Sequence, residues 1–288
     1  MNSQTGFGEQ VSYFTSEMRR QWKFHIFMET IFYSMNNALC IVPVATLRKE
    51  PRHEAEMTSQ LLFGEAVELL AAHGDWVELL CLYDGYTGYC MRNQLVEVDE
   101  AIALMDQVPL VNTWSGVMMV NDVPMHVPFG SAVPGLQNGE AVWNDQWIKS
   151  SSKLVMEGAY VFDEESIRQI AFSFLNTTYL WGGRSVFGID CSGFTQNLMR
   201  FFGKKLPRDA SNQAMVGEDV GFLQEARCGD LAYFDNEDGK IIHVGLLLND
   251  HEIVHAAGKV RIDHIDTAGI IHRRSGERTH RLRTIKRL

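Results

Sequence analysis

The stretch Tyr179-Leu-Trp-Gly-Gly-Arg-Ser-Val-Phe-Gly-Ile-Asp-Cys191-Ser-Gly-Phe194 decides the fold of this chain. It places a cysteine directly after an aspartate and at the start of a helical pattern, whose apolar side chains recur on one face as far as Phe202. Gly203 supplies the stop signal, and Asp190 is the natural N-cap. The pattern therefore predicts a helix with Cys191 in its first turn.

The first turn of a helix favours the reactive form of a cysteine. Its backbone N–H groups have no partners within the helix, and the helix dipole is positive there, so a thiolate is stabilised. The thiolate is the nucleophilic form of the side chain. The carboxylate of Asp190 works against it, so we expect a protonated histidine to assist. A lone cysteine in apolar surroundings is more often inert, but this combination indicates that Cys191 is a nucleophile.

Two histidines follow in the segment Gly229–Gly258. It reads as three strands in a meander, with turns at Asp235–Lys240 and Asn249–Glu252. Folding the second hairpin brings His243 and His255 within about one residue of direct opposition, and the pattern leaves the register and the shared face open. A single strand histidine is usually structural, but here the chemistry assigns His243 as the base. His255 would hold the other ring nitrogen of His243.

Four ordered motifs resemble those of the NlpC/P60 cysteine peptidases, over roughly residues 160–288. They are Asp190-Cys191-Ser192-Gly193-Phe194, Pro207-Arg208-Asp209-Ala-Ser-Asn-Gln213, Gly229-Asp230-Leu231, and His243-Val244-Gly245 with His255. The resemblance implies an α+β, papain-like core in reduced form, with the helix carrying Cys191 packed on a small antiparallel sheet. It implies a Cys–His–His site that cleaves cell-wall peptides, usually between γ-D-glutamate and a diamino acid. It also places Tyr179 beside the nucleophile, where it stabilises the oxyanion.

Length and composition set the outer limits. With 288 residues, two or three domains are expected, and 45% hydrophobic with 22% charged residues is ordinary for a soluble protein. The sequence lacks any run near the ~20 apolar residues that a membrane span requires, so no membrane partner is expected. The net charge of −10 argues against nucleic acid and suits a ligand with an ammonium group, although solubility is the commoner reason for it.

The cysteines are five in number: Cys40, Cys81, Cys90, Cys191 and Cys228. The count is odd and lacks zinc-site spacing, so we expect neither a disulfide framework nor a metal, and no cofactor. Reduced thiols in a cytoplasmic protein are the simplest account. Residues 1–36 read as an extension. The apolar run Met18–Ser34 is interrupted by His25 and Glu29 and lacks a clean cleavage site, so it is not a signal peptide, and translation starting at Met35 is the alternative.

The chain divides further before the peptidase segment, residues 159–288. Residues 37–98 carry short β-branched runs broken by glycines at about ten-residue spacing, which predicts a small β-barrel. They resemble bacterial SH3-type (SH3b) domains through Leu47-Arg-Lys-Glu-Pro, Leu62-Phe-Gly-Glu65, Gly74-Asp-Trp76 and Asp84-Gly-Tyr-Thr-Gly-Tyr89. Residues 99–158 look like a second, divergent copy. Its hairpin signal is Asn138-Gly139, and its expected core is Trp114, Trp143 and Trp147.

Two SH3b domains ahead of an NlpC/P60 domain resemble the peptidases that recycle muropeptides. The resemblance implies that the first barrel walls the active site and that acidic and tyrosine side chains hold the free ammonium of L-alanine. Asp209 matches one acid by its motif, Glu56 is the candidate for the other, and Tyr86 is the aromatic wall, with Tyr89 as its rival. Ser192 either binds the substrate's carboxylate or supports the turn.

The expected function is a cysteine endopeptidase that hydrolyses the γ-D-glutamyl–diamino acid bond of small murein peptides with free N-terminal L-alanine, through a thioester. One alternative is a peptidoglycan-binding module or a hydrolase of intact murein. Another is a Cys–His acyltransferase or amidase, which has no use for Asp209 and Glu56 together.

The basic run His272–Leu288 is the last feature. Its charges suit an anionic polymer, but the recurring Leu282, Ile285 and Leu288 favour a strand with a solvated face.

Overall fold

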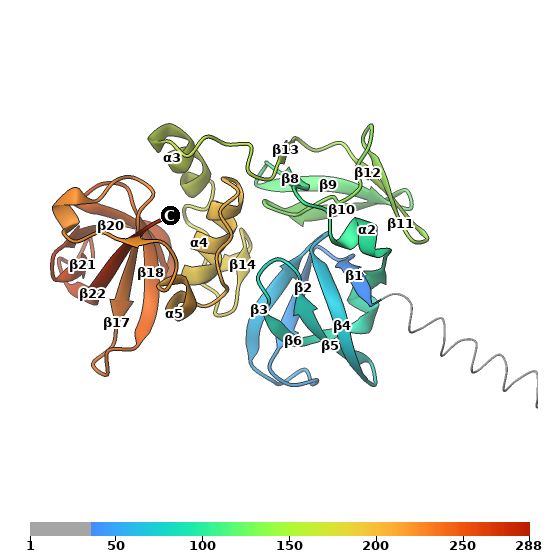
Figure 1. The fold of residues 1–288 in the computed structure, drawn as a ribbon, viewed down its shortest axis with the longest axis horizontal. Coiled ribbons are helices and arrows are strands. Elements are labelled where there is room, and N and C mark those ends of the chain that lie inside the picture. Colours follow the sequence, from blue (N-terminus) through green and yellow to red (C-terminus); the bar gives the residue numbers. More distant parts are fainter. Residues whose placement is uncertain (1–35) are drawn as a thin grey trace, which may run out of the picture.

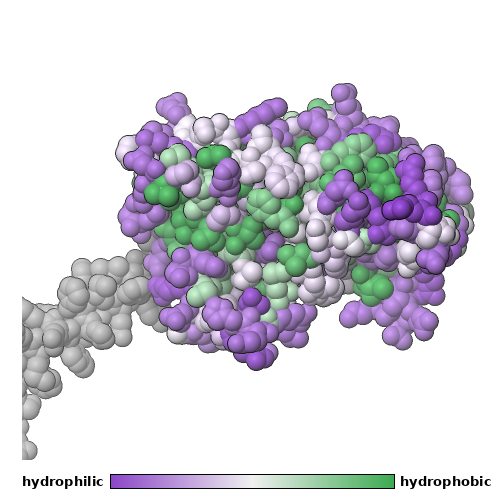
Figure 2. Space-filling model, turned by 180° about the vertical axis from the view of Figure 1, so that it is seen from behind, coloured by the Kyte–Doolittle hydropathy of each residue, from purple (hydrophilic) through white to green (hydrophobic). Residues whose placement is uncertain are grey.

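The computed structural model describes residues 36–288. The expectations about the N-terminal extension and about Met35 lie outside the described residues. Within the described part, no helix is long and apolar enough to cross a membrane. Two β-rich units lie on one side of the molecule, and a third unit with the longer helices lies on the other (Figure 1). Seen from behind, apolar side chains are exposed in separate patches over both halves of a mostly polar surface (Figure 2).

The first unit is one sheet of short antiparallel strands in the order β3-β2-β6-β5-β4-β1-β7. Its elements are β1 (Asn37–Cys40), β2 (Val44–Arg48), β3 (Met57–Leu62), β4 (Ala66–His73), β5 (Trp76–Cys81), β6 (Thr87–Met91), the 3-10 helix η1 (Arg92–Gln94) and β7 (Leu95–Glu97). Alternate side chains such as Leu47 and Leu79 point into a common core. Gly74 and Gly85 adopt φ of 65° and 73° in the turns, which explains the glycines at these positions.

The second unit holds a four-stranded sheet in the order β10-β9-β12-β11 and the pair β13-β8. Its elements are α2 (Glu100–Ala103), β8 (Pro109–Val111), β9 (Ser115–Val120), β10 (Val123–Pro128), β11 (Glu140–Trp143), β12 (Gln146–Ser150) and β13 (Leu154–Met156). The predicted turn at Asn138 and Gly139 is present. Both residues have positive φ, 52° and 84°, as a tight hairpin turn requires.

Only one of the three tryptophans expected in this core is buried. Trp143 packs against Phe63 of the first unit with ring centroids 5.0 Å apart, so the two units share a core. Trp114 and Trp147 are 56% and 48% exposed, and the expectation for them is wrong. Trp147 lies on the outward phase of β12, and Trp114 packs edge-on against Phe187 of the third unit, 5.4 Å away.

The third unit is an antiparallel sheet in the order β16-β22-β17-β18-β19-β20-β21, which the pairing of β21 with β22 closes into a barrel. Its helices are α3 (Glu164–Phe172), α4 (Cys191–Arg200), α5 (Ala210–Gln213) and the 3-10 helix η2 (Leu223–Glu225). Its strands are β14 (Arg184–Ser185), β15 (Gly188–Ile189), β16 (Glu218–Asp219), β17 (Leu231–Asp235), β18 (Ile241–Leu247), β19 (Glu252–Ala257), β20 (Lys259–Asp266), β21 (Gly269–Ile271) and β22 (Arg278–Arg287). The predicted meander is β17, β18 and β19.

Helix α4 lies between the barrel of the third unit and the N-terminal units (Figure 1). Phe194 and Leu198 pack into the core on β18 and β19, as the one-face spacing predicts. Its polar side chains are buried too, because the other side meets the first unit. Gln196 Nε2 donates to Asp84 of that unit at 2.7 Å, and Asn197 Nδ2 donates to the carbonyl of Arg184 at 2.9 Å.

A buried charge cluster fixes the first unit to the third unit. The carboxylate of Glu65 accepts two hydrogen bonds from Arg184, at 2.6 and 2.9 Å, and one from Arg200 at 2.9 Å. All three side chains are at most 5% exposed. Arg184 and Arg200 hold the pKa of Glu65 below its usual value against the opposing effect of burial, so Glu65 is ionised.

The basic C-terminal run forms β22, as the strand interpretation predicted. Leu282 and Ile285 contribute to the barrel's core. Arg281 and Arg283 project outward, and both approach the carboxylate of Asp235 on β17, at 2.7 and 3.8 Å. The charges of this strand therefore pair with acids on neighbouring strands.

Candidate active site

Cys191 begins α4, and Asp190 caps it. Oδ1 of Asp190 accepts the N–H of Gly193 at 2.7 Å, and Oδ2 accepts the N–H of Gly182 at 2.9 Å. A side chain at Gly193 would collide with the carbonyl oxygen of Gly183, so the glycines let the approaching loop close over the helix start. The predicted cap and position of the cysteine are both present.

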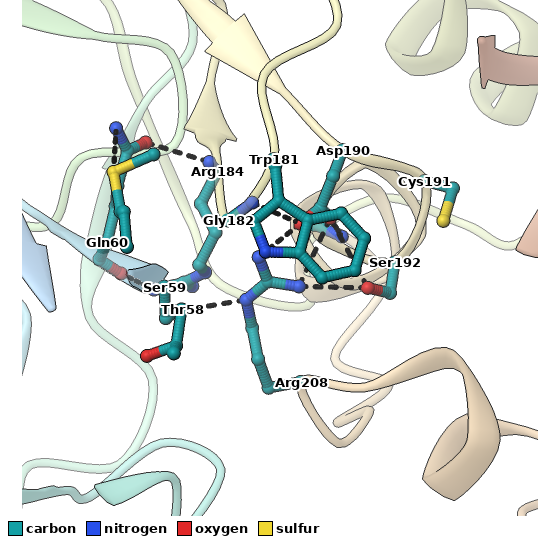
Figure 3. Close-up of polar contacts among 12 residues, drawn as sticks. Thr58, Ser59, Gln60, Trp181, Gly182, Arg184, Asp190, Cys191, Ser192 and Arg208 are labelled. Atoms are coloured by element: carbon teal, nitrogen blue, oxygen red, sulfur yellow. Dashed lines mark hydrogen bonds and ion pairs between the residues drawn. The ribbon is translucent and has the colours of Figure 1, made fainter. Parts of the chain in front are cut away.

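Arg208 organises the polar contacts on one side of the nucleophile, and the side chain of Cys191 points away from this network (Figure 3). The guanidinium of Arg208 holds Asp190 through two hydrogen bonds of 3.1 and 2.5 Å. Nε donates to the hydroxyl of Ser59 in the first unit at 2.9 Å. Arg208 is 3% exposed, so it ties the first unit to the helix start from within the interface. Sequence reasoning used this residue only as part of a motif.

Ser192 belongs to the same network. Its hydroxyl accepts from Arg208 Nη1 at 2.8 Å and donates to Asp190 Oδ1 at 3.3 Å. The side chain is 6% exposed. These contacts are those of a hydroxyl that supports the turn.

The burial of Cys191 opposes the stabilisation of a thiolate that is expected at the start of a helix. Burial raises its pKa to about 12, and the charge of Asp190 adds to this effect. The backbone N–H groups of Val244 and Ser192 and the charge of Arg208 act in the opposite direction without overcoming burial. The proton must therefore leave to a base during the reaction.

The two histidines lie on one face of the barrel's sheet. His255 is paired with Gly245, so His243 is two residues from direct opposition, one more than expected. Positions 243 and 245 share a face of β18 because side chains alternate, and both imidazoles therefore meet. Nε2 of His243 lies 2.9 Å from Nδ1 of His255. A side chain at Gly245 would collide with Ile253 and with Cβ of His255, so glycine makes room for the ring.

Asp263 on β20 extends this pair, and the sequence interpretation missed it. Its Oδ2 lies 3.0 Å from Nε2 of His255 and accepts a hydrogen bond from Nε of Arg261 at 2.8 Å. Arg261 is the pairing partner of His255, which places the acid two residues further along a neighbouring strand. The alternation in Lys259-Val-Arg-Ile-Asp263 was the available signal.

His280 is a second residue that the sequence interpretation missed. Its ring stacks on that of His243, with centroids 4.1 Å apart and an interplanar angle of 23°. Nitrogens of His243, His255 and His280 lie within 4.8 Å of one another. Stacked rings direct their nitrogens in parallel planes, and the facing nitrogens of His243 and His255 bind each other, so the arrangement does not fit a metal ion. Burial places the pKa of His243 well below 6.5 and that of His280 at about 4, so both rings are neutral.

Tyr179 lies within electrostatic reach of Cys191 and Asp190, and its role at the oxyanion stays a prediction. Burial raises its pKa to about 12, and the nearby side chains of Cys191 and Asp190 contribute. Its phenol therefore keeps a proton that it can donate. Its backbone is held by a hydrogen bond from its N–H to the carbonyl of Gly258, at 3.0 Å.

The candidate substrate residues come from the first and the third unit. Glu56 accepts a hydrogen bond from the indole N–H of Trp181 at 3.0 Å, and it is exposed. Tyr86 is half-buried, hydrogen-bonds Thr58, and is close enough to Asp209 for that charge to raise its pKa, behind the larger effect of burial.

Asp209 precedes α5 as its N-cap residue, but its carboxylate makes no capping hydrogen bond. Asp209 is solvent-exposed, but neighbouring atoms partly shield its carboxylate from water. This shielding raises its pKa, and the charges of Asp190 and Asp84 add to the effect. Tyr89, the rival of Tyr86, packs edge-on against His73 at 5.3 Å instead. The roles of these residues stay predictions.

A buried cysteine at a helix start, backed by a chain of imidazoles on a barrel, defines the site as that of a cysteine hydrolase. Residues 176–279 match the NlpC/P60 family, and residues 47–95 match the bacterial dipeptidyl-peptidase Sh3 domain. The chain is 31% identical over 214 residues to a gamma-D-glutamyl-L-lysine dipeptidyl-peptidase of Bacillus subtilis (strain 168), which covers 69% of this chain and 71% of that protein. The protein therefore belongs to the NlpC/P60 family of cysteine peptidases.

Other similarities extend over more of the chain. A Bacillus cereus protein of the same name is 27% identical over 257 residues, which is 78% of this chain and 75% of that protein. Dipeptidyl-peptidase 6 of Lysinibacillus sphaericus is 28% identical over 269 residues, 82% of this chain and 94% of that one.

Two solved structures share the fold. An NlpC/P60 family protein from Bacillus cereus has a TM-score of 0.74 at 20% identity and covers 87% of this chain and 99% of that chain. An NlpC/P60 endopeptidase from Photobacterium damselae subsp. piscicida has a TM-score of 0.65 at 15% identity, over 85% and 71%. The predicted α+β class, with an SH3-like N-terminal domain before the papain-like domain, is confirmed.

Proposed function

We propose that this peptidase hydrolyses the bond between γ-D-glutamate and a diamino acid, diaminopimelate or lysine, in small cell-wall peptides with a free N-terminal L-alanine. The names of the Bacillus relatives, gamma-D-glutamyl-L-lysine dipeptidyl-peptidases, support this substrate class. The observation that carries the proposal is a pair of exposed carboxylates near the start of α4. Glu56 of the first unit bonds Trp181 in the loop before Cys191, and Asp209 of the third unit lies within electrostatic reach of Asp190.

The acids suit an ammonium group. Asp209 lies within electrostatic reach of Tyr86 and of Asp84, so the first unit adds an aromatic face and a further negative charge. Glu56 is held toward the loop before the nucleophile by the indole of Trp181. A peptide that carries this charge gains attraction to both carboxylates, and a ligand without it gains none.

The reaction is acyl transfer through a thioester. His243 takes the thiol proton of Cys191, and the sulfur attacks the γ-carbonyl carbon. The phenol of Tyr179 and backbone N–H groups stabilise the oxyanion. The protonated His243 returns the proton to the departing amine of the diamino acid, then activates water, which releases L-Ala-D-Glu and the free thiol.

The site proposed here excludes intact murein, because its L-alanine is amide-linked to sugar and carries no charge. The enzyme would then act on released peptides, in a recycling role. We further propose a cytoplasmic location, which is supported by the free state of all five cysteines.

Product analysis tests the proposal. L-Ala-γ-D-Glu-diaminopimelate and its lysine counterpart are incubated with the enzyme and with Cys191→Ala, and the products are identified by mass spectrometry. L-Ala-D-Glu and the free diamino acid, formed only by the wild type, are expected. Cleavage at another bond, or acyl transfer to an added amine without hydrolysis, would contradict the proposed function.

A further inference from the structure

Asp263 ends a buried chain of hydrogen bonds that begins at the base. Nε2 of His243 lies 2.9 Å from Nδ1 of His255, and Nε2 of His255 lies 3.0 Å from Oδ2 of Asp263. The three side chains are 5%, 0% and 1% exposed. Because water does not reach the chain, each proton position is set by the neighbouring partner.

Asp263 is held as a carboxylate. Arg261 Nε donates to Oδ2 at 2.8 Å, and the backbone N–H of Arg273 donates to Oδ1 at 3.0 Å. These bonds and that from His255 keep its pKa well below the usual range, although burial opposes them. An ionised carboxylate only accepts hydrogen bonds. At this end of the hydrogen-bond chain, the direction of the hydrogen bond is therefore fixed.

The direction of this bond determines which nitrogen of each imidazole carries the proton. His255 must carry its proton on Nε2 to donate to Asp263. Burial lowers the pKa of His255, so the ring is neutral and its Nδ1 keeps a lone pair. Nδ1 of His255 can then only accept, and His243 must donate from Nε2. The single remaining lone pair of His243 is on Nδ1.

We propose that Asp263 is a positioning residue of the peptidase reaction, which fixes the tautomer of both histidines so that Nδ1 of His243 is the base for the Cys191 thiol. In the first step the S–H bond breaks and an N–H bond forms at Nδ1, which leaves a thiolate and an imidazolium. Asp263 stays ionised and stabilises that imidazolium through His255. The inference rests on the roles of Cys191 and His243 and is independent of which peptide is cleaved.

Asp263→Asn removes the fixed direction of this bond while keeping the size. The amide can turn its NH2 group toward His255, which reverses both bonds and puts a proton on Nδ1 of His243. Loss of the negative charge also makes His243 a weaker base. We expect kcat to fall by ~10- to 1000-fold with little change in KM, since removing an orienting carboxylate from such a chain is costly.

The pH dependence separates this role from a structural one. The charged or titratable groups around the chain are Cys191 from α4, Arg261 from β20, His272 beyond β21 and His280 from β22. All of these remain in the variant. The reaction of Cys191 with iodoacetamide is followed at that residue by peptide mapping. In Asp263→Asn this reaction should become slower, and the pH below which it stops should fall. Asp266→Asn is the matched control, because Asp266 lies on the same strand and pairs with Arg278 outside the chain.

The nitrogen-15 NMR spectrum of histidine-labelled enzyme tests the tautomers directly. His243 and His255 of the wild type should both be protonated on Nε2 alone, and Asp263→Asn should acquire Nδ1 protonation at His243. A wild-type His243 protonated on Nδ1 would overturn the proposal, as would a folded Asp263→Asn enzyme with unchanged tautomers and kcat. The wild-type spectrum alone tests the proposed tautomers, so the test holds even if the variant does not fold. It needs no substrate, so its outcome is distinct from that of the product analysis.

Discussion

The indole N–H of Trp181 donates a hydrogen bond to the carboxylate of Glu56, at 3.0 Å, across the boundary between the catalytic unit and the first barrel. The two residues are separated by 125 positions in the chain. Trp181 lies in the loop that leads to Cys191, so this contact brings an acid of the N-terminal barrel toward the nucleophile. It places Glu56 of that barrel against the loop before the nucleophile.

Replacing Trp181 by phenylalanine tests the contact. The ring remains, but Glu56 loses its donor and becomes free to turn away. We expect KM for a peptide with a free N-terminus to rise by ~3- to 10-fold with kcat nearly unchanged, because one hydrogen bond to a charged group contributes about 1–2 kcal/mol at most at an exposed site. Trp147→Phe, an exposed tryptophan of the second unit, should leave both constants unchanged. An unchanged KM in Trp181→Phe would mean that Glu56 is not positioned by this bond.

The nucleophile and its base should be indispensable. Cys191→Ala and His243→Ala are each expected to abolish nearly all hydrolysis while the far-ultraviolet circular dichroism stays native. His255→Ala should retain more activity, because it acts through His243 rather than on the substrate. Substantial turnover by either of the first two variants would remove these residues from the mechanism.

Arg208→Lys tests the support of the helix start. Lysine keeps the charge but cannot hold both oxygens of Asp190 and reach Ser59 at once. We expect kcat/KM to fall by ~10-fold or more, which is the loss expected from one buried, charge-assisted hydrogen bond. Lys204→Arg, a few residues earlier, is the control. An enzyme as active as the wild type would show that the network is not needed for catalysis.

The interface cluster should dominate the stability of the junction. Glu65→Gln leaves Arg184 and Arg200 buried beside a neutral group, which is expected to cost about 3–5 kcal/mol. The urea midpoint measured by tryptophan fluorescence should fall accordingly. Glu68→Gln, three residues along, is the control and should shift the midpoint little. Equal midpoints for the two variants would contradict the role given to Glu65.

The buried histidines predict a pH dependence of stability. The pKa of His243 lies well below 6.5 and that of His280 at about 4, so the unfolded chain binds protons first as the pH falls. Stability is therefore fully present above pH ~6.5 and declines as the pH falls from there toward 4. Melting temperatures across this range measure the slope. His280→Gln should make it shallower, whereas exposed His264→Gln should not; a slope unaffected by His280→Gln contradicts the assignment.

Local patterns predicted the catalytic helix and the meander correctly, because both follow from signals close together in the chain. The cap at Asp190 and the one-face stripe led to α4, and the turn residues separated β17, β18 and β19. The fold class could also be predicted, since the motifs of the peptidase segment resemble a known family.

Features that depend on contacts between distant residues could not be predicted from the sequence. The two-residue offset of His255 depends on the exact turn, and Asp263 meets His255 only through the pairing of β19 with β20. Trp114 lies outside the core of its own unit and packs against Phe187 of the third unit. The high pKa of Cys191 arises from burial under a loop and strands that the helix pattern alone does not reveal.

The central claim is that the carboxylates Glu56 and Asp209 select a free ammonium, and one ratio tests it most directly. It is the ratio of kcat/KM for L-Ala-γ-D-Glu-diaminopimelate to that for the same peptide acetylated on its N-terminus. Acetylation removes the charge that the two acids would meet and adds bulk at the same place, so the ratio should be ~100 or more, equivalent to about 3 kcal/mol. Asp209→Asn should reduce it by slowing the free peptide. Equal rates for the two peptides would contradict the account and indicate a hydrolase that also acts on the intact wall.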